Sequence, residues 1–327
     1  MMKRRVMAAL CVVLALTAGT AAGCGDDDDG GGGEGGQQAE DLTVGVSLAS
    51  PTIPLYVAMA KGIRERAKQL GVEVTFTEAN EDPVQQLNDV QDLIAQDVDG
   101  ILISPIDAEA AVPAYEDARA AGITIMSIAR NTSPELEDSF IGAPWNEFGS
   151  QIAKWICDHG GEGKKMAMIK GPAGASFVED MEDGFKQATE QDCPSSSIAF
   201  ENNNAPLSPD KGLASTQDAI TADPDIDVFY ANNDDLAGGV IQALQEKGVS
   251  MDEVIVTGFD GTPKGLEAAQ AGDLDYTIAL RPESWGRLGL ETMVKSLRGE
   301  SVPKLVRIET LPISEENAKE VTQQDIQ

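Results

Sequence analysis

The sequence predicts an α/β protein made of two doubly wound lobes, each with a parallel sheet covered by helices on both faces. Short apolar strands alternate with amphipathic helices from residue 42 onwards. Strand–helix–strand order is typical of parallel sheets that are buried on both faces. The number of strands exceeds what one compact lobe holds, and the chain after residue 40 is long enough for two domains.

In the first half, strands are predicted where apolar residues run together, and helices where they recur every three or four residues. Tyr56, Met59 and Ile63 show the helical interval, and Gly71 ends that helix. The predicted strands cover residues 42–46, 72–76, 101–103 and 123–128. The predicted helices cover residues 56–70, 84–94 and 108–121.

The second half repeats this alternation. Its predicted strands cover residues 166–169, 198–200, 228–230, 254–256 and 276–278. Its predicted helices cover residues 146–157, 177–190, 210–222 and 284–298, with further helices between the later strands. His159, the only histidine, comes just before Gly160 and Gly161, so it is expected to end a helix.

Residues 1–23 have the pattern of an export signal. Three basic residues precede an apolar run over residues 6–16, which is too short to span a bilayer. Small residues then lead into Cys24, an arrangement that resembles a bacterial lipobox, in which the cysteine is acylated. The alternative is an ordinary secretory signal with an incidental cysteine. Both interpretations predict a globular part that works outside the cytoplasm.

Residues 24–40 are rich in Gly and Asp and are predicted to form a flexible tether. Four consecutive aspartates, 26–29, lack the spaced ligands of a calcium loop and are expected to be a solvated charge run. The chain has 55 acidic and 24 basic residues, which argues against nucleic-acid partners. With one histidine and no ligand cluster, neither a metal nor a cofactor is expected.

Cys157 and Cys193 remain after the cysteines of the N-terminal segment are set aside. An even pair in an exported protein favours a disulfide. The alternative is two buried free thiols.

Polar residues follow several predicted strands. Ser47, Ser104 and Arg130 do so in the first half, and Asn233 and Asp260 in the second. In open α/β sheets, ligands bind beyond the carboxyl ends of the strands. Amide, carboxylate and guanidinium groups suit a ligand with many hydroxyls, because each hydroxyl both donates and accepts.

The segments 99–105 (DGILISP) and 258–263 (GFDGTP), with Asn233-Asp234 between them, resemble the type I periplasmic sugar-binding proteins. The similarity is greatest to the ribose/galactose-binding group that serves ABC importers, and it runs from about Leu42 to Glu309. It implies two Rossmann-like lobes joined by a three-segment hinge, with crossings near 141–145, 279–282 and 308–312. One lobe would hold residues 41–143 and 281–310, and the other residues 144–280 and 311–327.

The resemblance also implies the site. Arg130, Asn233 and Asp260 match positions that hydrogen-bond sugar hydroxyls, and Tyr56 matches an aromatic position that stacks on the sugar ring. Ser104 replaces a usual Asn. Further ligand contacts are expected from Ser47 and Arg281. Apolar residues stand near three positions that are usually polar or aromatic, which predicts a smaller or less hydroxylated ligand: Met181, Leu207 and Leu280.

Each site residue also has a structural alternative. Asp260 and Asn233 are both suited to cap a following helix. Arg130 could pair with a surface acid, and Tyr56 could face the core. Trp145 and Trp285 fall near crossings and are expected to pack at the hinge.

The predicted function is that of a monomeric, lipid-anchored receptor that passes a small sugar-like solute to an ABC permease in the membrane. The alternative is a sensory receptor that presents such a ligand, or an autoinducer, to a membrane sensor. An exported enzyme is not expected, because Ser47 and Ser104 have no nearby histidine base. The export signal also replaces any DNA-reading head, which excludes a repressor of related fold.

Overall fold

The computed structural model describes residues 42–132 and 136–327, and it contains two six-stranded sheets. The strands of the first sheet run in the order β11-β5-β4-β3-β1-β2, with all neighbours parallel. These strands are β1 (Thr43–Leu48), β2 (Glu73–Glu78), β3 (Gly100–Ile103), β4 (Thr124–Ile128), β5 (Ser139–Gly142) and β11 (Leu305–Arg307). We call this sheet and its helices the N-terminal lobe.

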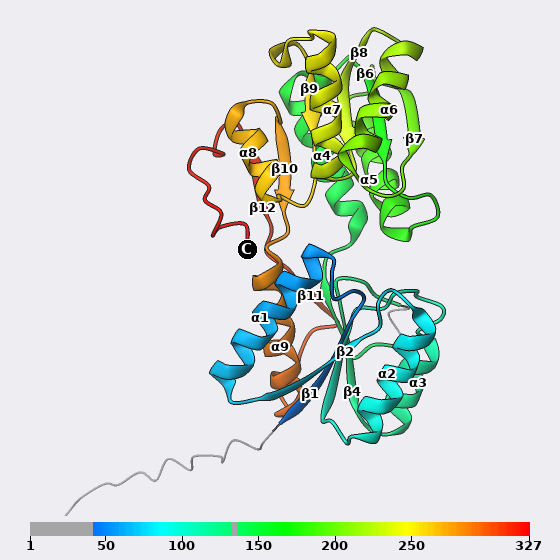
Figure 1. The fold of residues 1–327 in the computed structure, drawn as a ribbon, viewed down its shortest axis with the longest axis vertical. Coiled ribbons are helices and arrows are strands. Elements are labelled where there is room, and N and C mark those ends of the chain that lie inside the picture. Colours follow the sequence, from blue (N-terminus) through cyan, green and yellow to red (C-terminus); the bar gives the residue numbers. More distant parts are fainter. Residues whose placement is uncertain (1–41, 133–135) are drawn as a thin grey trace, which may run out of the picture. The chain divides into compact units, whose positions relative to one another are not determined.

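Helices cover both faces of this sheet (Figure 1). Leu102 of β3 packs with α1 (Pro54–Leu70) and α9 (Pro282–Leu297), whereas its neighbours Ile101 and Ile103 pack with α2 (Pro83–Ala95) and α3 (Val112–Ala120). Successive side chains of a strand point to opposite faces, so each strand supplies two cores. At Gly62 of α1 a Cβ atom would lie 2.0 Å from the carbonyl oxygen of Glu283, so only glycine lets α1 approach α9 this closely.

The second sheet has the order β12-β10-β9-β8-β6-β7 and forms the C-terminal lobe. Its strands are β6 (Lys165–Lys170), β7 (Ser197–Asn203), β8 (Ile226–Ala231), β9 (Ile255–Thr257), β10 (Tyr276–Ala279) and β12 (Leu311–Ser314). Five of them are parallel, while the edge strand β12 is antiparallel to β10. The predicted doubly wound lobe is confirmed, and the antiparallel edge strand β12 is an addition that was not predicted.

Two groups of helices enclose the second sheet (Figure 1). Met166 and Met168 of β6 pack in the same core as α4 (Trp145–Ile156) and α5 (Ser176–Asp192). Ala167 and Ile169 of the same strand pack on the other side, where α6 (Pro209–Ala222), α7 (Asp234–Lys247) and α8 (Pro263–Ala271) lie. The chain passes between the two lobes three times: between β5 and α4, between β10 and α9, and between β11 and β12. These passages fall at the predicted crossings.

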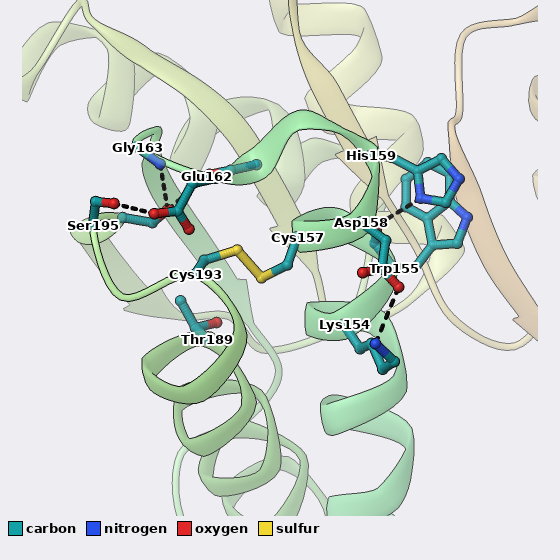
Figure 2. Close-up of a disulfide and its surroundings, with 12 residues drawn as sticks. Lys154, Trp155, Cys157, Asp158, His159, Glu162, Gly163, Thr189, Cys193 and Ser195 are labelled. Carbon is teal, nitrogen blue, oxygen red and sulfur yellow. Dashed lines mark hydrogen bonds and ion pairs between the residues drawn. A yellow bond between two sulfur atoms is a disulfide. The ribbon is translucent and has the colours of Figure 1, made fainter.

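Cys157 and Cys193 are joined in a disulfide, with Cα atoms 5.6 Å apart (Figure 2). Cys157 begins a π-helical turn (Cys157–Gly161) at the end of α4, and Cys193 directly follows α5. The bond therefore ties together the ends of two helices that pack on the same face of the sheet. His159 lies in that turn, and its ring stacks on Trp155 with centroids 4.2 Å apart.

The strands and helices predicted from apolar periodicity are present, but three short strands, β5, β11 and β12, were not predicted. The helix expected over residues 108–121 begins only at Val112, after a turn. The predicted export signal, Cys24 and the tether lie outside the described residues. Among the helices of the described segments, none is both long and apolar enough to cross a membrane. The division into lobes at the stated residues stays a prediction.

Candidate functional site

In the N-terminal lobe, three candidate residues form one buried hydrogen-bonded group. Ser47 is the last residue but one of β1 and Ser104 follows β3, and both are fully buried. The Ser104 hydroxyl donates to the hydroxyl of Tyr56, at 3.3 Å. Gln86 of α2 donates to Ser47 Oγ at 3.3 Å and to the Ser104 carbonyl at 2.9 Å. Tyr56 is only 2% exposed and belongs to the hydrophobic core.

Arg130 lies at the carboxyl end of β4, beside this group. It is half-buried, and its Nη1 donates to the carbonyl of Ile106 at 3.4 Å. Its guanidinium carbon lies 5.8 Å from the centre of the Tyr56 ring, within the range of a cation–π contact. Ala129 has a left-handed backbone, with φ at 66°, and so turns the chain sharply after the strand. One end of this lobe therefore brings together Ser47, Ser104, Tyr56 and Arg130. Their contacts with a solute stay predictions.

In the C-terminal lobe, the structure brings Asn233 and Asp260 together. Asn233 caps α7 by accepting a hydrogen bond from the Leu236 amide at 3.0 Å. Its neighbour Asp234 is bonded through its amide to the carbonyl of Phe259, the residue before Asp260, and the Asn233 side chain lies close enough to Asp260 to lower the pKa of that carboxyl group. Asp260 has φ at 98° and forms an isolated parallel bridge with Ala279, the last residue of β10: its amide donates to the Ile278 carbonyl and its carbonyl accepts from the Leu280 amide. Asp260 does not cap α8; Thr262 does, by accepting from the Gly265 amide at 3.1 Å. That structural alternative for Asp260 is wrong.

The carboxyl group of Asp260 is electrostatically unusual. Burial raises its pKa well above the ordinary value of 3.8, and the negative charge of Asp234 raises it further. The nearby Asn233 side chain acts in the opposite direction and lowers the pKa of Asp260, while the charge of Asp235 adds to the rise. Perturbed carboxyl groups of this kind cluster at functional sites, although structural networks produce them too.

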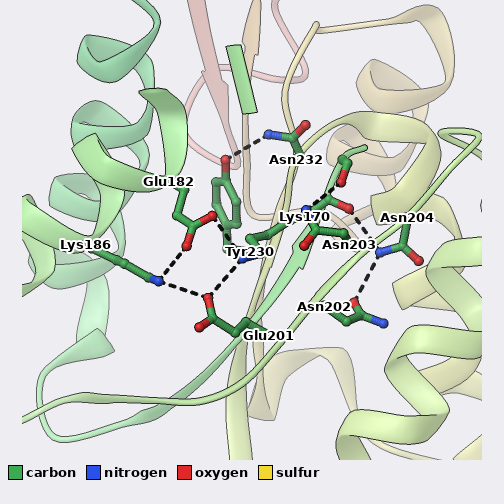
Figure 3. Close-up of polar contacts among 10 residues, drawn as sticks. Lys170, Glu182, Lys186, Glu201, Asn202, Asn203, Asn204, Tyr230 and Asn232 are labelled. Carbon is green, nitrogen blue, oxygen red and sulfur yellow. Dashed lines mark hydrogen bonds and ion pairs between the residues drawn. The ribbon is translucent and has the colours of Figure 1, made fainter. Parts of the chain in front are cut away.

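A network of ion pairs borders the same end of the C-terminal lobe (Figure 3). Lys170, at the end of β6, is 8% exposed and pairs with Glu182 and Glu201 at 2.9 and 3.1 Å. Lys186 contacts the same two carboxylates. The network fixes the end of β6, and sequence reasoning missed it because its members come from two strands and a helix.

Next to this network lies an amide group that also went unpredicted. Asn232 is 2% exposed, and its nitrogen donates to the Tyr230 hydroxyl at 3.2 Å (Figure 3). The same nitrogen points to the sulfur of Met181, at 3.7 Å. Its oxygen has no hydrogen-bond partner among the described residues. Met181 and Leu280 are buried, and Leu207 is half-buried against a core cluster, so all three apolar replacements belong to packed regions.

The remaining candidates take different positions. Arg281 directly precedes α9, with φ at 53°, and its guanidinium lies 3.7 Å from Glu309. Trp285 is buried, and its indole nitrogen donates to the Ile141 carbonyl at 3.0 Å. Trp145 packs edge-on against Phe259, the residue before Asp260, with ring centroids 6.0 Å apart. A ligand role for Arg281 stays a prediction.

Comparisons with known proteins agree with this architecture. A family model described as a periplasmic binding protein domain matches residues 44–301. The ribose import binding protein of Bacillus subtilis is 31% identical over 267 residues, which cover 82% of this chain and 85% of the relative.

Solved structures are similar as well. The crystal structure of a periplasmic ribose ABC transporter from Conexibacter woesei has a TM-score of 0.82 and 26% identity, and covers 88% of this chain and 96% of its own. A solute-binding protein of an ABC transporter from Mycobacterium smegmatis, with bound glycerol, has a TM-score of 0.75 and 33% identity, with coverages of 86% and 96%. Since the family model covers most of the sequence, and the two sheets carry the same fold, the chain belongs to the periplasmic binding protein family.

Proposed function

We propose that this protein is the solute-binding component of an ABC importer and that it binds a small, uncharged sugar or polyol. The observation that carries the proposal is the proximity of Asn233 and Asp260 at the strand ends of one lobe, with Arg130 at the strand ends of the other. An amide, a carboxyl group and a guanidinium together offer the donors and acceptors that hydroxyl groups need.

The class of solute is supported by the relatives. One is named for ribose import, and one solved relative holds glycerol. Met181 and Leu280 present no polar groups where the resemblance implies polar side chains. A solute with fewer hydroxyls than a hexose fits this composition best.

The proposed mechanism is closure of the two lobes on the solute. The three chain crossings form the hinge, and the lobes hold residues 41–143 with 281–310 and residues 144–280 with 311–327. Contacts from both lobes favour the closed form, which then docks on the permease. The protein acts as a binding protein and not as an enzyme.

We further propose that the protein is a monomer held at the outer face of the cytoplasmic membrane by a lipid on Cys24. The residues after Cys24 would act as a tether. Incorporation of labelled fatty acid tests this: it is expected in the native chain and absent from a Cys24→Ser variant. Labelling of both proteins, or of neither, contradicts the anchor.

Calorimetric titration with pentoses, hexoses and polyols, including D-ribose and glycerol, tests the solute class. Saturable binding of one such solute is expected. The Asp260→Ala variant should bind it about tenfold more weakly or worse, because a hydrogen bond to a charged group is lost. A folded protein that binds no member of the library contradicts the solute class. Solute uptake that is unchanged by deletion of the gene would contradict import and favour a sensory receptor.

A further inference from the structure

Asp234 is a buried carboxyl group that the proposed contacts with a solute do not use. It is 4% exposed and follows Asn233 at the start of α7. Its Oδ1 accepts from the Thr277 hydroxyl at 2.7 Å. Its Oδ2 accepts from both the amide and the hydroxyl of Thr262, at 2.6 and 3.0 Å. Both oxygens of this buried carboxylate therefore accept hydrogen bonds, from three donors in all.

The surrounding backbone is fitted to this carboxylate. At Gly258 a Cβ atom would lie 2.5 Å from Asp234 Oδ1, and at Gly265 it would lie 2.1 Å from Oδ2. Neither position has room for a side chain while the carboxylate stays in place. One acidic side chain therefore accounts for glycine at two positions, Gly258 in the loop after β9 and Gly265 in α8.

The bonds of Asp234 join the elements that carry the candidate contacts. Thr262 ends the loop that holds Asp260, and Thr277 belongs to β10, to which Asp260 is bonded through its backbone. The amide of Asp234 also donates to the carbonyl of Phe259, at 2.9 Å. One residue thus fixes the loop of Asp260 against the start of α7, where Asn233 lies.

We infer that Asp234 is a positioning residue that holds Asn233 and Asp260 in register for a common ligand. The inference rests on the proposed function, in which these two side chains contact the solute. Asp234 acts through them and does not touch the solute itself.

Asp234 also affects Asp260 through its charge, and this effect can be measured. Its negative charge contributes to the raised pKa of Asp260. Asp235 on the same helix adds to that rise, and Lys264 of α8 borders, with Asp234 and Asp235, a small hollow of about 50 Å³. Asn233 is the neighbour that lowers the pKa of Asp260. Removal of the charge at Asp234 should therefore lower the pKa of Asp260, which loss of a merely structural contact would not do.

The decisive experiment is a carbon NMR titration of the Asp260 carboxyl group in the ligand-free protein. In Asp234→Asn its pKa is expected to fall by about one pH unit, because a nearby like charge is removed. The asparagine can still accept from Thr262, and its nitrogen can donate to the Thr277 hydroxyl. The matched control is Asp275→Asn in the same lobe, whose carboxylate accepts from the Val256 amide in β9 and not from the loop of Asp260. In this control the pKa of Asp260 should not move.

Asp234→Ala tests the positioning itself. Amide hydrogen exchange at Gly261 and Thr262 is expected to speed up at least tenfold while the lobe stays folded, as judged by circular dichroism. If exchange stays at the native rate, or if the pKa of Asp260 is the same in Asp234→Asn and the native protein, the inference is overturned. Should Asp234→Ala fail to fold, the Asp234→Asn titration alone decides the outcome.

Titration with D-ribose and glycerol separates this inference from the proposed function. Where either probe binds the native protein, Asp234→Ala should bind it about tenfold more weakly, and Asp234→Asn should recover most of that loss. Equal affinity of Asp234→Ala and the native protein overturns the inference. If NMR finds the coupling but no sugar or polyol binds, the proposed solute class fails and the positioning of Asp260 stands.

Discussion

Glu137 is a single carboxyl group whose ionisation should be visible in the stability of the whole N-terminal lobe. It is 2% exposed, and its Oε2 has no hydrogen-bond partner among the described residues. Ser127, whose hydroxyl lies 2.7 Å from the Tyr115 hydroxyl, is a polar neighbour of this carboxyl group. Burial raises its pKa from 4.5 to about 7, although the nearby Ser127 hydroxyl and the charge of Lys304 act against the rise. A buried group of this kind favours its protonated form.

The sign of the pH dependence follows from that direction. Because the pKa of Glu137 is higher in the folded than in the unfolded state, its stabilising contribution to the free energy of unfolding is complete below about pH 4.5. It falls as the pH rises and is lost above about pH 7. Urea denaturation at pH 4.5 and pH 7.5 should therefore show a smaller loss of unfolding free energy in Glu137→Gln than in the native protein. The difference should be about 2–3 kcal/mol, since one pKa unit corresponds to about 1.4 kcal/mol.

Glu116→Gln is the matched control, because Glu116 is exposed on the same helix as Tyr115. The change in the free energy of unfolding between pH 4.5 and pH 7.5 should be the same in Glu116→Gln as in the native protein. Identical pH profiles for Glu137→Gln and the native protein would contradict the assignment. Burial raises the pKa values of Asp234 and Asp275 to about 6. The free energy of unfolding should therefore keep some dependence on pH in every variant.

Residue patterns predicted part of the site and missed the part that depends on side-chain direction. The motif around Asp260 and the Asn233-Asp234 pair indicated two groups that the structure does bring together. The alternation of strand and loop could not show that Asp234 points inward to three donors. Nor could it show that Ser47 and Ser104 are bound by Gln86, which lies on a helix between the two strands in sequence.

At the scale of elements, the close packing of α5 on α4 in the C-terminal lobe depends on glycine. At Gly184 of α5 a Cβ atom would lie 1.9 Å from the carbonyl oxygen of Asn146 in α4. Gly184→Ala should lower the free energy of unfolding by about 1–3 kcal/mol, because the backbones must separate. Denaturant titration measures the change.

Gly238→Ala provides the control for that substitution. Gly238 is exposed within α7, and a Cβ atom there would meet nothing within 4 Å. Alanine should stabilise this helix by about 0.5–1 kcal/mol, since glycine loses more backbone entropy in a helix. If both variants changed stability in the same direction, close packing at Gly184 would not be the cause.

The disulfide constrains the same pair of helices at their ends. Cys157 and Cys193 are 36 residues apart in sequence, and closing a loop of that length stabilises by about 4 kcal/mol in the chain-entropy model. The double variant Cys157→Ser/Cys193→Ser should lose about that amount in equilibrium denaturation. The native protein with dithiothreitol should match it. Native stability in the double variant would show that the bond contributes nothing in solution.

The three strands that were not predicted are short, and none of them holds more than two consecutive apolar residues. β11 has three residues, and β5 and β12 have four each. β12 also contains Pro312, which is tolerated because β12 is an edge strand. Its antiparallel pairing with β10 depends on where the chain returns after β11, and no local pattern carries that information.

At the scale of the whole molecule, the alternation of strands and helices was enough to predict two lobes, because a parallel sheet requires a crossover helix for almost every strand. The motif resemblance then supplied the connectivity, since the three crossings join segments far apart in sequence. The placement of Arg130 in one lobe and Asp260 in the other is a consequence of that connectivity.

Lobe closure predicts a change that small-angle X-ray scattering can measure. A saturating solute, identified by calorimetry, should lower the radius of gyration of the native protein, because contacts from both lobes stabilise the closed form. Arg130→Ala and Asp260→Ala each remove the proposed solute contact of one lobe, so each variant should compact less than the native protein at the same solute concentration. Glu116→Gln should compact like the native protein. Superimposable scattering curves with and without a solute that calorimetry shows to be bound would mean that binding does not move the lobes, and the hinge mechanism would have to be abandoned.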